Sequence, residues 1–127
     1  MSQGTKYNSF TDNSTLSGTL TLSAASDKFQ TADPNGSART VQLPDLRDHT
    51  NDTTSGTGTV GTDLYADHSS GFFVINNAAN GDEALNIKGW NGTNTTTTLG
   101  TPTQAESALC DWTGSTLGWI VNVVSTA

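Results

Sequence analysis

The chain has 127 residues, of which 32% are apolar, and a formal net charge of −7 at pH 7. The chain has five Lys and Arg against twelve Asp and Glu, too few basic residues to form a surface that binds nucleic-acid phosphates. No nucleic-acid partner is therefore expected. The length predicts one domain, and the grouping of apolar residues into short runs between turn-forming clusters indicates a folded chain. Because so small a core must offset a large chain entropy, we expect the domain to gain stability by association.

The first fifteen residues are polar apart from Tyr7 and Phe10. They precede the first alternating stretch without a turn that would fold them back, so we predict an N-terminal arm over residues 1–15. A frayed terminus is the alternative. The arm has no basic cluster followed by an apolar stretch, so a secretory signal is not expected, and no apolar run is long enough to predict a membrane partner.

Two β patterns follow the arm. Residues 16–22 place Leu16, Leu20 and Leu22 on one face, the period-two pattern of a half-buried strand. Residues 29–44 then read as a hairpin, in which a strand, the turn sequence DPNG and an alternating strand ended by Pro44 succeed one another.

A long polar segment, residues 45–71, separates this pattern from the next strand. Its length exceeds that of an ordinary loop, and its few large apolar residues are predicted to anchor it across its own sheet or a neighbour's. These anchors are Leu46, Val60, Leu64 and Tyr65.

The same segment holds both histidines, together with several aspartates. They are His49, His68, Asp45, Asp48, Asp52, Asp63 and Asp67. Such side chains can ligate a metal or transfer protons, but no metal-motif spacing and no nucleophile context accompany them. We therefore expect a solvated loop with no metal or other cofactor, and a small hydrolase is one alternative.

The run Phe72, Phe73, Val74 and Ile75 is continuous and apolar, which predicts a central strand covered on both faces. We expect part of this apolar surface to close against neighbouring subunits, which makes these four residues the interface candidates. The Asn-Gly pair that follows, with the alternation over residues 84–90, predicts a second hairpin.

The remaining sequence predicts three more strands. Residues 91–100 read as a turn and a polar strand, and "AESALCDW" and "WIVNVVS" flank the turn sequence "TGSTLG". Cys110 is expected to be a small buried apolar residue rather than a nucleophile. About eight short strands at roughly ten-residue spacing predict an all-β sandwich or barrel.

The three tryptophans are the remaining candidates for a binding site. Trp112 and Trp119 lie in apolar strands, so burial in a core or interface is expected for them. Trp90 lies at a loop, where its ring is the better candidate for stacking on a sugar.

The stretches "SGTLTLSAASDKFQTADPNGSARTVQLPD", "GFFVINNAANGDEALNIKG" and "AESALCDWTGSTLGW" occur in this order over roughly residues 16–119. Together they resemble the small trimeric head-decoration, or cement, proteins of tailed bacteriophages. There a polar strand, a D-P-x-G turn, a "TVxLP" strand, a "G-x-x-F-x-I-x-N" strand, an "A-x-x-L-x-I" strand and a closing "A-x-x-x-C-D-G" segment succeed one another. Two departures are the long segment 45–71, which looks like an insertion, and "CDW" in place of "C-D-G".

The resemblance implies a single antiparallel β-sandwich or β-tulip (jelly-roll-like) domain over residues 16–127, with the inserted loop 45–71. It implies a homotrimer that binds the major capsid protein of a phage head, on the outer surface of the virion, after synthesis in the host cytoplasm. It implies no enzymatic activity and no cofactor, and it makes Tyr7 and Phe10 the candidates for capsid contact. The alternatives are a head or tail fibre module that binds host glycan, a secreted carbohydrate-binding module and the small hydrolase.

Overall fold

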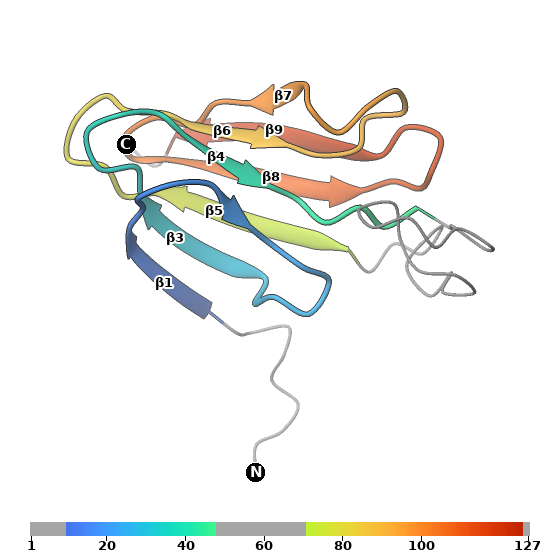
Figure 1. Ribbon diagram of the computed structural model, residues 1–127, viewed down its shortest axis with the longest axis horizontal. Helices are drawn as coiled ribbons and strands as arrows, with labels where there is room; N and C mark the ends of the chain where they lie inside the picture. Colours follow the sequence, from blue (N-terminus) through green and yellow to red (C-terminus); the bar gives the residue numbers. More distant parts are fainter. Residues whose placement is uncertain (1–9, 48–70, 126–127) are drawn as a thin grey trace, which may run out of the picture.

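In the computed structural model, which describes residues 10–47 and 71–125, these residues form nine β-strands in two facing sheets (Figure 1). The strands are β1 (Phe10–Thr15), β2 (Leu20–Thr21), β3 (Phe29–Asp33), β4 (Arg39–Gln42), β5 (Phe72–Asn77), β6 (Leu85–Lys88), β7 (Thr98–Gly100), β8 (Glu106–Trp112) and β9 (Trp119–Ser125). The predicted all-β, sandwich-like class is confirmed. None of the described residues belongs to a helix that could cross a membrane.

The chain alternates between the two sheets over its first six strands. One sheet has the order β1-β3-β5-β8-β9 and the other β2-β4-β6-β7. Within each sheet the first three strands are parallel, and Phe10 lies opposite Phe29 one circuit later. Parallel neighbours need a crossover, and here each crossover is a strand of the opposite sheet, as in the coils of a solenoid.

This winding contradicts the two predicted hairpins and the antiparallel sandwich. β3 and β4 belong to different sheets, as do β5 and β6. The turn at Pro34 is present, with positive φ at Asn35 (65°) and Gly36 (85°), but it carries the chain across the gap between sheets. Turn residues specify a change of direction locally, whereas the partner of each strand depends on residues distant in sequence.

The C-terminal strands pair with their neighbours in the sequence, on either side of the predicted turns. β7 returns antiparallel to β6, and β9 returns antiparallel to β8. The turn between β8 and β9 contains Gly114 (φ 109°) and Gly118 (φ 72°). A side chain at Gly118 would meet the carbonyl oxygen of Trp90, so this turn requires glycine for space as well as for backbone conformation.

The N-terminal predictions need two corrections. Residues 10–15, assigned to the arm, form the edge strand β1, and the backbone N–H of Leu16 donates to the carbonyl of Asp33. Residues 16–22 are not one strand, because the chain leaves the first sheet after Thr15 and enters the second at Leu20. Leu16 and Leu22 are nevertheless buried, as their period predicted.

The core fills the space between the sheets. Its largest fully buried side chains include Trp119, Phe73, Ile75, Leu85 and Ile87. The indole Nε1 of Trp119 donates to the carbonyl oxygen of Pro44 over 2.9 Å, which fastens β9 to the chain that follows β4. The predicted burial of Trp112, Trp119 and Cys110 is confirmed.

Candidate functional site

Strand β5 divides the four predicted interface residues between two faces. Phe73 and Ile75 point into the core and are 1% and 0% exposed, whereas Phe72 and Val74 face outward and are half-buried. Of the four interface candidates, Phe73 and Ile75 are therefore not on the surface that could meet a neighbour, whereas Phe72 and Val74 remain candidates. Successive side chains of a strand point to opposite faces, and the core of the subunit itself takes one set.

The strand register places apolar residues in one line across the outer face of the five-stranded sheet. Phe10 pairs with Phe29, Phe29 with Val74, and Val74 with Leu109. We call these four residues the outward apolar row. They come from β1, β3, β5 and β8, which lie side by side in Figure 1.

Packing on this face leaves the row accessible at its edge. The ring of Phe72 contacts Phe29 edge-on, with centroids 6.3 Å apart, and Phe10 is 57% exposed. The Nζ of Lys28 lies 5.7 Å from the centroid of Phe72 and 5.0 Å from that of Phe73. Partial burial lowers the pKa of Lys28, because desolvation disfavours its charged form.

Phe10 and Val74 were predicted from the sequence as contact residues, but for different contacts, and Phe29 and Leu109 were not predicted as contact residues. Both missed residues lie in predicted strands, yet nothing local shows that they share a face with Val74. The parallel pairing of β3 with β5 across segment 45–71 places Phe29 beside Val74, and the antiparallel pairing of β8 with β5 places Leu109 there. The row is thus a product of the tertiary structure.

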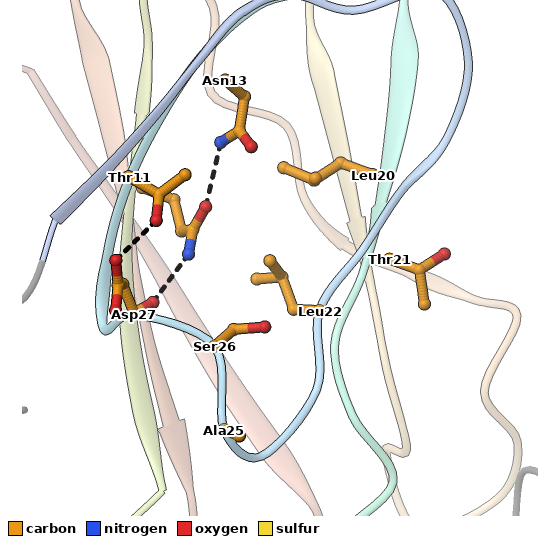
Figure 2. A pocket seen from close by; sticks show the side chains of 9 residues that line it. Thr11, Asn13, Leu20, Thr21, Leu22, Ala25, Ser26 and Asp27 are labelled. Carbon is orange, nitrogen blue, oxygen red and sulfur yellow. Dashed lines mark hydrogen bonds between the residues drawn. The ribbon is translucent and has the colours of Figure 1, made fainter.

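A pocket of about 370 Å³ opens between the edge strands of the two sheets (Figure 2). Asn13 Nδ2 donates to Gln30 Oε1 over 2.9 Å, and Gln30 Nε2 donates to the carbonyl of Asp27 over 2.7 Å. Thr11 Oγ1 donates to Asp27 Oδ2 over 2.6 Å. The labelled side chains in Figure 2 show a polar wall from β1 and the segment before β3, facing Leu20 and Leu22.

These hydrogen bonds give the polar wall a structural role. Gln30 is 2% exposed and would be costly to bury without partners, and Asn13 and Asp27 provide them. The network fastens β1 to β3. It lies at the edge of the sandwich formed by β1 and β2, on the side opposite β7 and β9. The polar wall of this pocket therefore helps to hold β1 in the sheet.

One face of the Trp90 ring, which was predicted to stack on a sugar, is covered by another side chain. The guanidinium carbon of Arg47 lies 3.6 Å from the ring centroid of Trp90, and Arg47 Nη2 pairs with Asp45 Oδ2 at 2.6 Å. The indole Nε1 donates to the carbonyl of Ser115 over 2.7 Å. A sugar stacked on that face would have to displace a paired cation.

The long segment is described only at its two ends. Leu46 is 6% exposed and belongs to the core, as expected of an anchor. The remaining predicted residues of this segment, and Tyr7, lie outside the described residues; they are Val60, Leu64, Tyr65, His49, His68, Asp48, Asp52, Asp63 and Asp67. Within residues 10–47 and 71–125, no group of three or more His, Cys, Asp and Glu could hold a metal ion.

Cys110 is predicted to resist thiol reagents while the chain is folded. Burial, and secondarily the charge of Asp111, raise the pKa of Cys110 to about 12, so the reactive thiolate is scarce at pH 8. We expect labelling by a chromogenic disulfide reagent at pH 8 only after denaturant is added. Because the folded pKa lies above the ordinary value of 9.0, the unfolding free energy should fall as pH rises above about 9. Rapid labelling of the native protein would contradict this.

Comparisons with known proteins find no match for this chain. No family model, curated protein or solved structure matches the chain. The outward apolar row and the strand pattern of the sequence are therefore the observations on which a functional proposal rests.

Proposed function

We propose that this chain is a structural protein of a tailed-bacteriophage virion, which decorates and stabilises the capsid as a homotrimer. The observation that carries the proposal is the outward apolar row, because an apolar line across an open sheet face needs a partner to cover it. The sequence resemblance to trimeric decoration proteins supports the number of subunits and the capsid as partner. The finer fold type, a β-tulip or jelly-roll-like sandwich, belongs to the same proposal.

Neighbouring subunits are the partner that we assign to Phe29, Val74 and Leu109 of the row, whereas Phe10, at its exposed edge, is assigned to the capsid. Phe72 and Val74, the two interface candidates that remain on the surface, lie on this face beside Phe29. The row itself carries no charge, but Asp12 and Asp111 are exposed on the same face, two residues along β1 and β8 from Phe10 and Leu109, so the uncharged contact with a second copy is limited to the line of the row. Association also supplies the buried apolar surface that the small core of one subunit lacks.

Capsid contact is assigned to one end of the sheet. β1, β3 and β5 are parallel and begin at the same end, where Phe10 is the first residue of β1 and is 57% exposed. Tyr7, three residues earlier, lies outside the described residues and completes the proposed contact. Aromatic side chains suit a small patch that must contribute most of a binding energy, and three linked copies multiply its effect. In this role the protein acts on the outer capsid surface, after synthesis in the host cytoplasm.

Solution mass and binding to undecorated heads test the proposal together. Light scattering at micromolar concentration should return three times the chain mass of 13.2 kDa. The double variant Tyr7→Ala/Phe10→Ala should remain trimeric, yet bind undecorated heads at least about tenfold more weakly, because each subunit loses two contact side chains.

Two outcomes would count against this assignment. Unchanged binding by the double variant would move the capsid contact to the body of the domain or to segment 45–71. A wild-type trimer that binds no head but binds a glycan array would favour the fibre or carbohydrate-binding alternative.

A further inference from the structure

Strand β9 is an edge strand with apolar side chains exposed on both of its faces. It is the last strand in the order of its sheet, and β8 is its one neighbour among the described strands of that sheet. Ile120 and Val124 point outward and are 44% and 41% exposed, while Val123 points inward and is still 40% exposed. The inner face is covered near β7, where Gly100 lies against Val121 and Val123, so that contact does not occupy the free edge.

This edge lacks the usual protection against pairing. Natural edge strands are commonly guarded by lysine, proline, a bulge or a charge that points inward. Residues 112–125 contain no charged residue and no proline, although the chain as a whole carries twelve Asp and Glu. Seven residues of β-branched, aromatic and small polar side chains, with no other described strand paired along one edge, are typical of a strand that receives another strand.

We propose that β9 pairs along this edge with β1 of a second copy, so that the five-stranded sheet continues from subunit to subunit. This inference rests on the homotrimer of the proposed function and names its contact. β1 is the opposite edge of the same sheet, and because an irregularity in its register lies between Asp12 and Thr15, the pairing is assigned to its regular part, residues 10–12. An interface between two different edges is heterologous, and such an interface closes into a ring when the rotation allows.

Strand direction agrees with a ring. β5 is parallel to β1 through β3, β8 is antiparallel to β5, and β9 is antiparallel to β8, so β9 runs parallel to β1. A rotation about an axis along the strands leaves their direction unchanged, and β9 therefore meets β1 of the next copy as a parallel pair. The ring has an inner and an outer side, and the outward apolar row, which needs cover, takes the inner one.

Charge favours a second copy over a partner of another kind. A cationic partner would be drawn to the acidic surfaces of the chain and not to β9, which offers no charge. In the proposed pair, Asp12 on β1 of one copy approaches β9 of the other copy, and β9 carries no charged residue. Uncharged β9 is thus the edge along which two acidic subunits can approach most closely.

Cysteine cross-linking tests this pairing in the full-length protein. Asp12 and Asn122 are exposed on the face that carries the outward apolar row, at opposite edges of one sheet. Four strand spacings place them more than about 19 Å apart within a subunit, beyond the reach of a short bis-maleimide. The double variant Asp12→Cys/Asn122→Cys should therefore cross-link only between subunits and give covalent trimers on a denaturing gel. Each single variant is the control and should remain monomeric there, because Cys110 is buried.

The cross-linking outcomes separate the possible arrangements. Dimers from Asn122→Cys alone would show that β9 pairs with itself, and would overturn the β9–β1 contact. An uncross-linked double variant that still has trimer mass would also overturn it, while leaving the proposed function in place. A monomeric wild-type protein at micromolar concentration would remove the proposed function first.

A lysine on the edge provides an independent measurement. Val124→Lys places a charge where the added strand would lie, and we expect at least a tenfold increase in the concentration needed for trimers. Thr98→Lys, on an exposed position of β7 in the other sheet, is the matched control and should leave the trimer intact. Circular dichroism establishes that both variants fold, and a folded Val124→Lys with unchanged association would contradict the proposal.

Discussion

Replacing Val74 with aspartate is expected to convert the proposed trimer into folded monomers. Val74 lies in the middle strand of the five-stranded sheet and points outward, in line with Phe29 and Leu109. A carboxylate at this position stays hydrated in a monomer but is buried without a partner in the trimer. The cost is on the order of several kcal/mol at each contact, so association should weaken by at least about a thousandfold.

The measurement is the mass by light scattering over a range of concentrations, together with circular dichroism to establish folding. Val74→Thr is the control that tests shape without charge, and it should retain most of the trimer. Thr96→Asp adds the same charge at an exposed position between β6 and β7 and should leave the mass unchanged. A trimeric Val74→Asp variant would show that this face does not lie between subunits.

Replacing Trp119 with alanine is expected to cause the largest loss of fold stability. Trp119 is 2% exposed, and its ring packs 5.6 Å from that of Trp112 and 5.8 Å from that of Phe73, measured between centroids. Its Nε1 also donates to the carbonyl of Pro44. Truncating a buried tryptophan costs about 3–5 kcal/mol, a large part of the roughly 5–15 kcal/mol that stabilises a domain.

Urea unfolding at one fixed protein concentration measures this loss, since association contributes to the apparent stability. Trp119→Phe should fall between the wild type and Trp119→Ala, because it keeps an aromatic ring and removes the hydrogen bond to Pro44. Leu117→Ala, two residues before Trp119, is the control. Because the Leu117 side chain is 61% exposed, this substitution should change stability by less than about 0.5 kcal/mol. Equal midpoints for Trp119→Ala and Leu117→Ala would contradict the packing described for the core.

The candidate surface could be predicted from the sequence only in part. The apolar run at Phe72 indicated a strand with a surface to cover, and Phe10 was identified as an accessible aromatic residue. That Phe10 and Phe72 share one face of the sheet could not be predicted, because this depends on the parallel register of β1, β3 and β5 across segment 45–71. The same register buried Phe73 and Ile75 inside the subunit.

What the sequence determined by itself is local. Period-two alternation identified Leu22, Val41 and Ile87 as buried, and the glycine-containing sequence before Trp119 was identified as a turn, on either side of which β8 and β9 pair. The tertiary structure alone decided which strands pair, because the turn at Pro34 serves equally to reverse a chain within one sheet or to carry it to another. Strand pairing is set by apolar faces that meet across the core, and those faces are brought together only when the distant parts of the chain have folded.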